Sequence, residues 1–147
     1  MNTKAYLRQY ADLVRKIERY KERIEGIENV LKGINLDGLP HGSSIGDPTK
    51  NAALNLALLE EQLQLAILEA EQTRQEIADN IEQMPTQKYK ELLFDRYLLL
   101  MRWEDVTDEM NFFRRGKEYE MKHVMGYMHG KALKELREVM QCSSRQS

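Results

Sequence analysis

Few residues in this sequence have the types and spacing that chemistry at a site would need. The single cysteine, Cys142, lacks both a disulfide partner and metal-ligand companions, and we interpret it as a thiol in a frayed tail. We interpret His41 as a solvated loop residue, and we do not expect His123 to bind a metal ion. Glu104 and Asp105 do not form a catalytic pair, because nothing near them supplies an apolar pocket, a nucleophile or a metal partner. Without a phosphate loop or a nucleophile–base pair, we expect neither an enzyme nor a bound cofactor or metal.

Positive charge gathers in the C-terminal third of the chain. The whole sequence carries a net charge of −2, which by itself argues against a strongly basic nucleic-acid binder, but residues 111–137 hold seven Lys and Arg against three Asp and Glu. A local excess of this kind is the electrostatic footprint of a DNA-binding segment. We therefore predict double-stranded DNA as a partner; the alternative is an ordinary solvated helix face. The candidate DNA-contacting residues are Arg114, Arg115, Lys117, Lys122, His123, Tyr127, Lys131 and Lys134.

Three helical patterns surround this basic segment. Apolar residues recur at helical spacing over residues 86–101 and again over 103–110, and a third stripe begins after Gly116 and continues to about residue 141. A supporting helix, a short helix and a longer basic helix in this order are typical of a helix-turn-helix, in which the last helix enters the major groove of DNA. The third stripe, interpreted as core rather than as an adaptable binding groove, consists of Met121, Met125, Met128, Ala132, Leu136 and Val139.

Three residues near the junction of the first two patterns are expected to be structural. Tyr97 and Trp103 are predicted to lie in the core of a small helical bundle. For Arg96 we favour an ion pair with Asp105 or Glu104 that joins the two helices. The alternative for Arg96 is a contact with a DNA phosphate.

The run RYLLLMRWEDVTDEM at residues 96–110 resembles the fourth conserved region of bacterial sigma factors. Together with the N-terminal helices and the run HGKAL at residues 129–133, it makes the chain similar to a family of phage and prophage proteins over most of its length. These proteins are described as sigma-region-4-like or as late-gene transcription activators of the RinA and ArpU type. The resemblance implies a helix-turn-helix, sequence-specific DNA binding and, by analogy with sigma factors, contact with the RNA polymerase of the bacterial host.

An insertion, assigned most simply to Arg114–Met121, separates this chain from the family pattern. Asn111 then stands at the family's Gly, and Lys122–Tyr127 stand at the recognition positions. Most relatives carry Arg at the outward position occupied here by Tyr127, which can contact phosphate or a thymine methyl but lacks a bidentate grip on guanine. The insertion implies either a longer turn or an earlier recognition helix, and the apolar stripe favours an early start after Gly116.

Two long helices are predicted in the N-terminal half. Apolar residues at alternating steps of four and three predict a coiled-coil helix over Thr3–Lys32. A loop over Asn35–Gly46 follows, and Asp47 with Pro48 starts a second helix that ends near Gln83. The short loop makes the helices antiparallel if they pair within one chain. The predicted seam includes Tyr10, Leu13, Ile17, Tyr20, Ile24, Ile27 and Leu31 of the first helix and Leu63, Ile67, Ile77 and Ile81 of the second.

Additional leucines widen the apolar face of the second helix beyond one stripe. They lie in its first half, at Leu54, Leu58, Leu59, Leu65 and Leu68. A wide face favours a third helix or a second subunit, so we predict a homo-oligomer, most simply a dimer. The alternative is that these leucines pack on the C-terminal part of the same chain. Domain-swapped pairing of the helices is a further possibility.

These patterns together predict an all-α protein in three parts. Residues 1–84 form a coiled-coil hairpin for oligomerisation or docking, residues 85–141 a helix-turn-helix, and residues 142–147 a disordered tail. The start of the chain lacks a signal-peptide core and no apolar run is long enough to span a membrane, so we expect the bacterial cytoplasm. The predicted function is that of a phage-derived DNA-binding transcription regulator. The alternatives are a small-terminase-like protein that recognises DNA for packaging, and a coiled-coil interaction module without DNA binding.

Overall fold

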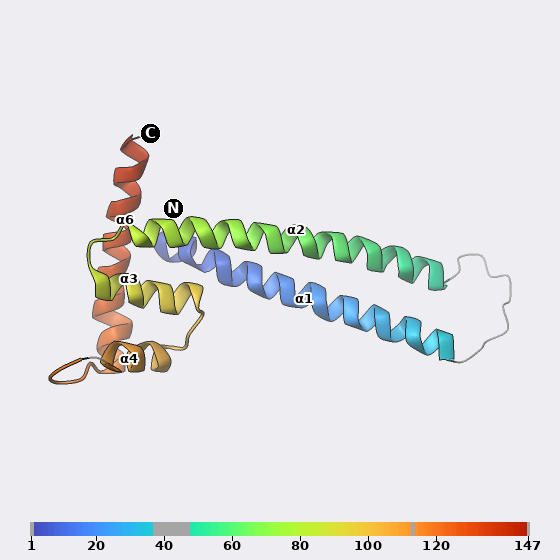
Figure 1. Ribbon diagram of the computed structural model, residues 1–147, viewed down its shortest axis with the longest axis horizontal. Helices are drawn as coiled ribbons and strands as arrows, with labels where there is room; N and C mark the ends of the chain where they lie inside the picture. The colour runs from blue at the N-terminus through green and yellow to red at the C-terminus, as the bar shows by residue number, and fades with distance from the viewer. Residues whose placement is uncertain (1, 37–47, 113, 147) are drawn as a thin grey trace. The chain divides into compact units, whose positions relative to one another are not determined.

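The protein is described by a computed structural model that covers residues 2–36, 48–112 and 114–146 (Figure 1). Within these ranges every element is helical, which confirms the predicted all-α class. Two of the elements, η1 and η2, are π-helical turns, in which the backbone hydrogen bonds span five residues rather than four. The elements are α1 (Thr3–Leu36), α2 (Pro48–Glu82), α3 (Gln87–Leu93), η1 (Phe94–Leu98), α4 (Trp103–Phe112), α5 (Met121–His123), η2 (Val124–Met128) and α6 (His129–Gln146).

Both long helices of the N-terminal half are present where the sequence predicts them. α1 begins at Thr3, and the Asn2 side chain caps it, because its Oδ1 accepts a hydrogen bond from the Lys4 backbone N–H at 2.9 Å. α2 ends at Glu82, shortly before Pro85, whose ring cannot continue a helix. The predicted loop beyond Leu36, with Asp47 as a cap, falls on residues 37–47 and lies outside the described residues.

The chain divides into two compact units, and the division differs from the predicted boundary after Met84. One unit is Leu13–Ala70, and the other joins Met1–Asp12 to Glu71–Ser147. The reason lies in the core of the second of these, where Leu7 and Ile77 are fully buried in the same apolar cluster as the C-terminal helices. The buried members of this cluster are Tyr6, Leu7, Ile77, Ile81, Met84, Leu92, Leu93, Tyr97, Leu98, Val106, Val124, Met128, Ala132 and Leu136.

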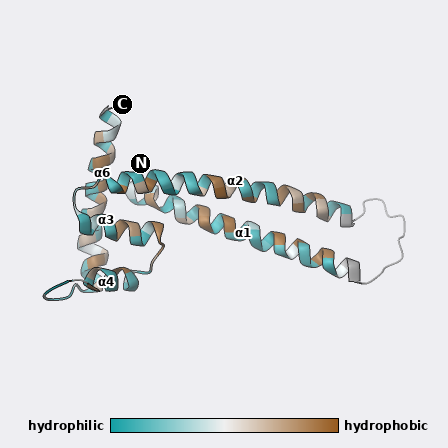
Figure 2. Cartoon of the chain, viewed as in Figure 1, coloured by the Kyte–Doolittle hydropathy of each residue, from teal (hydrophilic) through white to brown (hydrophobic). Residues whose placement is uncertain are grey.

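In the unit Leu13–Ala70, residues of α1 and α2 line one groove. Arg23, Ile27 and Val30 of α1 line a shallow apolar groove together with Ala52 and Leu59 of α2. Apolar and polar residues alternate along both helices (Figure 2). The most buried α2 residues in this unit are alanines, whose small side chains permit close approach of two helices. The α1 seam residues from Leu13 to Leu31 and the α2 seam residues Leu63 and Ile67 are half-buried, and Ala66 and Ala70 are buried.

The additional leucines of α2 form an exposed stripe. Leu54, Leu58, Leu65 and Leu68 are 61, 53, 61 and 51% exposed, respectively. Leu59, by contrast, is half-buried and faces the groove with α1. The alternative that these leucines pack on the C-terminal part of the chain stays a prediction. Their side chains leave a large apolar area in contact with water.

The C-terminal helices pack around α6. α3 contacts α6, and α4 contacts α3, η1, α5 and η2 (Figure 1). Glu135 of α6 ties the start of α3 in place, because its carboxylate accepts hydrogen bonds from the Thr86 backbone N–H and hydroxyl at 2.9 and 2.8 Å. This arrangement positions the basic segment on the outside of a closed core.

Three helix boundaries in this unit differ from those predicted. The helix predicted to reach Met101 ends at Leu98, and Leu100 takes up a left-handed backbone conformation with φ of 57°. The basic helix begins at Met121 rather than soon after Gly116. The tail predicted to be disordered from Cys142 onward instead continues α6 to Gln146. Within this last part of α6, Ser143 Oγ donates a hydrogen bond to Gln83 Oε1 at 3.2 Å.

Candidate nucleic-acid interface

His129 is the residue around which the C-terminal helices are fixed. It is 7% exposed, and its Nε2 lies 2.7 Å from the Tyr97 hydroxyl. Its ring stacks on Tyr97, with 5.8 Å between centroids, and meets Trp103 edge-on at 4.8 Å. Tyr97 is buried and Trp103 packs against the core, which confirms their predicted place in the bundle. One side chain of α6 thus joins η1 to α4.

The environment of His129 keeps its ring neutral. Burial, followed by the charge of Lys4, lowers the pKa of His129 from 6.5 to about 4, although a hydrogen bond to the Met125 backbone opposes this shift. A neutral ring that gives its one N–H to the Met125 carbonyl has Nε2 available as an acceptor. The Tyr97 hydroxyl therefore donates to Nε2, and burial raises the pKa of this hydroxyl.

Arg96 joins the same two helices, but through different chemistry from that predicted. Its Nη1 donates to the Met101 carbonyl at 2.8 Å, and its guanidinium lies 4.7 Å from the centre of the Trp103 ring. Asp105 and Glu104, the expected partners of Arg96, instead form ion pairs with Arg102 at 3.3 and 3.9 Å. The predicted ion pair of Arg96 is therefore wrong, whereas its structural position between the helices agrees with the expectation.

The predicted insertion forms an anchored loop between α4 and α5. The Asn111 side chain holds Tyr119 at both backbone groups: its Nδ2 donates to the Tyr119 carbonyl at 3.0 Å, and its Oδ1 accepts from the Tyr119 N–H at 2.8 Å. Arg114 Nε donates to the Lys117 carbonyl at 2.6 Å. Gly116 permits the turn between them, with φ of 114°, a conformation that L side chains rarely adopt.

From this loop onward, aromatic rings and cations form a continuous stack that we call the aromatic ladder. Tyr119, His123 and Tyr127 stack in sequence, with centroids 5.9 and 5.2 Å apart and interplanar angles of 13 and 20°. The Arg114 guanidinium covers the first ring at 3.5 Å, and the Lys131 ammonium lies 5.5 Å from the last ring. The ladder therefore has a cation at each end and a row of flat polar-tipped rings between them.

The ladder follows from spacing along the chain. His123, Tyr127 and Lys131 recur every four residues from α5 to α6, so the helical backbone brings them to one face. Tyr119 reaches His123 from the anchored loop. The π turn η2 lies between His123 and Lys131 and contains slightly more than four residues per turn. Residues four apart are therefore nearly aligned along this part of the helix. Stacked rings lose little further freedom on binding, since their neighbours already fix their orientation.

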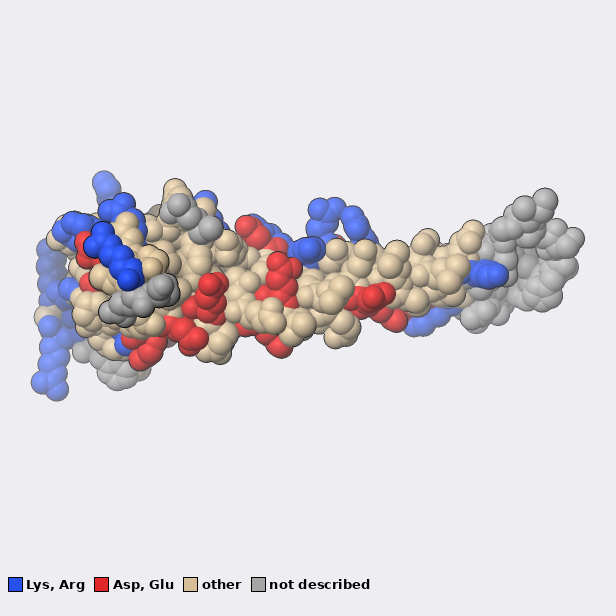
Figure 3. Space-filling model, turned by 90° about the horizontal axis from the view of Figure 1, so that it is seen from above, with Lys and Arg blue, Asp and Glu red and all other residues tan. Residues whose placement is uncertain are grey.

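All the predicted DNA-contacting residues are exposed, but the structure brings only some of them together. Arg114, His123, Tyr127 and Lys131 belong to the ladder. Lys134 follows on α6, Lys122 lies on α5, and Arg115 and Lys117 lie on the anchored loop. Figure 3 shows Lys and Arg side chains gathered over the part of the chain that contains the C-terminal helices.

The predicted methionine stripe is only partly core. Met128 is buried, but Met121 and Met125 are 42 and 40% exposed, and Val124 takes the inward position before Met128. The π turn η2 explains the exposure of Met121 and Met125. Its extra residue rotates the side chains before it to a different face from the one that an unbroken α-helix would give them. Met121 and Met125 therefore lie on the surface of the basic helix, beside the ladder.

Tyr119 completes the ladder by stacking on His123. Sequence reasoning missed one feature near this surface. Lys4 and Arg137, which lie near Lys134 around a pocket, come from opposite ends of the chain, so no local pattern joins them.

Other kinds of site are not apparent in the described parts of the chain. No group of three or more His, Cys, Asp or Glu side chains there is placed to hold a metal ion, and Cys142 is exposed on α6. None of the described helices is long and apolar enough to cross a membrane.

Comparison of the whole chain with family models, curated proteins and solved structures finds no match.

Proposed function

We propose that this chain is a non-enzymatic, DNA-binding transcription regulator. In this proposal α4 and the helical segment from α5 to α6 form a helix-turn-helix, with the anchored loop as its extended turn. α3 and η1 support the two helices through Arg96, Tyr97 and His129. The resemblance of residues 96–110 to sigma-factor region 4 supports a role in phage late-gene transcription in the bacterial cytoplasm, with host RNA polymerase as a further partner.

The aromatic ladder is the observation that carries the proposal. Its terminal cations suit phosphate oxygens, and the hydroxyl of Tyr127 and the ring nitrogens of His123 suit hydrogen bonds in a groove. Arg and Lys already held against aromatic faces keep their charge and lose less freedom on binding a phosphate. Tyr127 is 58% exposed, and in this proposal it meets the bases as an outward-facing residue of the recognition helix. The ladder thus supplies cations for contacts with phosphates and polar groups for hydrogen bonds with bases.

The long helices give the proposal its second part. We propose that α1 and α2 form an antiparallel coiled-coil hairpin, and that the stripe Leu54, Leu58, Leu65 and Leu68 of α2 pairs with a second copy of the chain. An exposed apolar stripe of this length on a helix is typical of a coiled-coil interface. Dimerisation would place two DNA-binding segments on one duplex and raise the affinity.

The same stripe also favours a second candidate function, that of a protein-interaction module without DNA binding. In this case the leucines of α2 would be the functional surface, and the C-terminal helices a structural bundle. The net charge of −2 agrees with this alternative. A DNA-packaging recognition protein, which combines similar parts, differs from the main proposal in its oligomer: a closed ring of many subunits would favour packaging.

Fluorescence anisotropy tests the main proposal directly. Duplexes from the DNA around the coding sequence are titrated with the protein at about 50 and 200 mM salt, the range over which phosphate contacts lose much of their affinity. An Arg114→Gln/Lys131→Gln variant removes both terminal cations of the ladder, and an Arg15→Gln/Lys50→Gln variant removes the same charge from the unit Leu13–Ala70.

We expect salt-sensitive binding that falls in the ladder variant and persists in the matched control. Loss of two phosphate contacts corresponds to a decrease of about 1.8 in the slope of log affinity against log salt. No binding at the lower salt concentration would overturn the DNA-binding proposal and favour the interaction module. Equal loss in both variants would show that the ladder has no special part in binding.

A further inference from the structure

Two exposed methionines lie on the helical segment that runs from α5 through η2 into α6, outside the core that encloses Met128. Met121 is 42% exposed and Met125 is 40% exposed, whereas Met128 is 1% exposed. Because Met121 and Met125 are four residues apart, their side chains form one apolar row along the helix surface. This methionine row gains free energy when a partner removes it from water.

The methionine row and the aromatic ladder are the two edges of one outward face. Successive residues of a helix are about 100° apart around its axis, so Lys122 lies between Met121 on one side and His123 on the other. Gly126 follows Lys122 by four residues and lies on the same line. Val124, on the opposite side of the helix from Lys122, is fully buried and marks the direction of the core.

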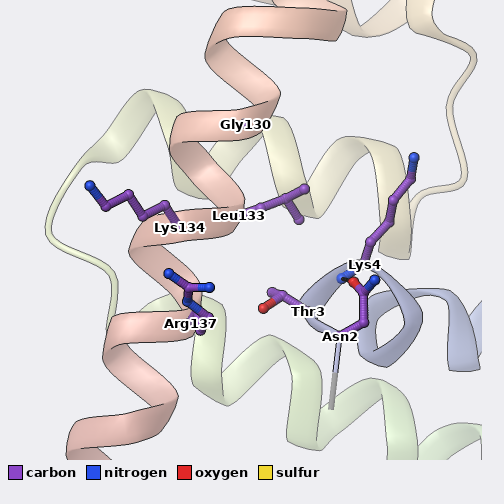
Figure 4. A pocket seen from close by; sticks show the side chains of 7 residues that line it. All are labelled: Asn2, Thr3, Lys4, Gly130, Leu133, Lys134 and Arg137. Carbon is purple, nitrogen blue, oxygen red and sulfur yellow. Dashed lines mark hydrogen bonds between the residues drawn. The ribbon is translucent and has the colours of Figure 1, made fainter.

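The line between the two edges is open, with a lysine at each end. It runs through Lys122, Gly126, Gly130 and Lys134 at intervals of four residues. A Cβ atom added at Gly126 or Gly130 would have no neighbour within 4 Å. Figure 4 shows Lys134 extending from the side of α6 opposite to Leu133, which packs against the core. A partner can therefore approach the backbone of this segment closely.

Charge indicates the class of partner that fits this face. Residues 121–134 include three lysines and neither Asp nor Glu, and none of these lysines forms an ion pair within the described parts of the chain. The face therefore favours a polyanion. Duplex DNA, the partner proposed above, is a polyanion whose major groove admits a helix. The apolar group that base pairs present in this groove is the 5-methyl group of thymine.

We propose that Met121 and Met125 contact thymine methyl groups in the major groove and give the protein a preference for thymine at the matching positions. This inference rests on the proposed function and adds to it a base that the segment selects. Methionine side chains suit such contacts, because they are flexible and polarizable. Residues 116–136 contain no Arg, the side chain that pairs best with guanine.

Removal of the methyl groups from the DNA tests the contact from one side. The shortest duplex that the wild-type protein binds is synthesised with deoxyuridine at every thymine, which retains the charge and the hydrogen-bonding groups of the bases. We expect fluorescence anisotropy to show an affinity about fourfold lower for each methyl group contacted. The slope of log affinity against log salt should stay the same, because no phosphate contact is lost.

The variant Met121→Gln/Met125→Gln tests the contact from the other side, since it retains the charge and length of both side chains and removes their apolar ends. It should bind the thymine duplex more weakly than the wild type and should bind the thymine and uracil duplexes equally. Met125→Gln alone should lose part of the preference, and Met125→Leu, which stays apolar, should retain it. Leu99→Gln, at a 50% exposed position between η1 and α4, is the matched control and should leave the preference unchanged.

The outcomes separate the methionine contact from the proposed function. Equal wild-type affinity for the two duplexes would overturn the contact and leave DNA binding standing. A full preference in Met121→Gln/Met125→Gln would also overturn it and would assign the methyl groups to another residue, such as Tyr127. If that variant also changes the mass measured by light scattering, the methionine row is an interface between copies of the chain. Absence of binding to any duplex would overturn the proposed function and the contact together.

Discussion

His129 shows how one residue joins three segments of the C-terminal core. It contacts Tyr97 of η1, Trp103 of α4 and the Met125 backbone of η2. The sequence identifies the His-Gly pair only through its resemblance to a family, and it places Tyr97 and Trp103 in the core by their helical spacing. The hydrogen bond between Tyr97 and His129 could not be predicted from the sequence, because it depends on how η1 and α6 cross.

Titration of His129 should make the fold less stable in mild acid. Its pKa is about 4 in the folded protein and near 6.5 when unfolded, so between these values the unfolded state binds a proton that the folded state does not. The contribution is fully present above pH 6.5 and is lost as the pH falls towards 4. We expect the free energy of unfolding to fall by about 1.4 kcal/mol per pH unit from this residue.

Urea denaturation at a series of pH values checks this prediction. His129→Gln serves as the comparison, because it retains a polar side chain without the titration. The variant should be less stable than the wild type at pH 7 and should show a flatter dependence on pH between 6.5 and 4. Parallel curves for the two proteins would contradict the assignment to His129.

At the scale of elements, the loop between α4 and α5 is held by side-chain contacts rather than by secondary structure. Asn111 replaces the hydrogen bonds that a helix or strand would have given Tyr119. The loop therefore presents Arg114 and Tyr119 as the first steps of the aromatic ladder, although it lies outside any helix.

Replacement of Asn111 by Ala should release this loop. Loss of both hydrogen bonds should cost about 1–2 kcal/mol of stability, because two backbone groups lose their partner. The Tyr119 amide should then exchange its hydrogen with solvent faster. The affinity for duplex DNA should also fall, because Tyr119, the first ring of the ladder, is no longer held in place. Asn111→Asp, which retains the acceptor for the Tyr119 N–H and loses the donor, should give an intermediate exchange rate.

The measurement is amide hydrogen exchange followed by mass spectrometry or NMR. The Leu92 and Val106 amides, in the buried parts of α3 and α4, provide internal controls. Faster exchange at these amides as well would show general destabilisation and would contradict a local role for Asn111.

Helix existence was predictable from this sequence, whereas several helix ends were not. The seams of α1 and α2, the pair Leu93 and Tyr97, and the set Trp103, Val106 and Met110 each have helical spacing, and those helices are present. The boundary at Leu98 depends on a π turn and on the left-handed Leu100, neither of which has a sequence pattern. The start at Met121 was missed because the methionine spacing also fits a helix that begins earlier, and η2 alters the register.

At the scale of the whole molecule, self-association depends on the leucine stripe of α2. These side chains are more than half exposed, so pairing with a second copy would remove them from water. Leu58→Glu/Leu65→Glu places like charges on the stripe and should shift a dimer to a monomer. Both positions face solvent, so the α-helical content of the chain should remain unchanged.

Light scattering coupled to size-exclusion chromatography measures this effect. Gln62→Glu/Gln64→Glu adds the same charge at exposed, non-apolar positions of α2 and serves as the control. A monomeric wild-type protein at concentrations of tens of micromolar would contradict the predicted self-association. A dimer that survives in the Leu58→Glu/Leu65→Glu variant would assign the interface to another surface.

The joining of Met1–Asp12 to Glu71–Ser147 in one unit has a consequence for synthesis on the ribosome. The chain leaves the ribosome from its N-terminus, so Leu7 emerges long before Ile77 and Leu136, with which it shares a core. Residues 13–70 have all the partners of their own unit well before translation ends. The other unit needs contacts between residues far apart in the sequence, which form slowly. Its first segment therefore remains without its apolar partners until α6 has emerged, and this interval exposes the nascent chain to aggregation and to chaperones.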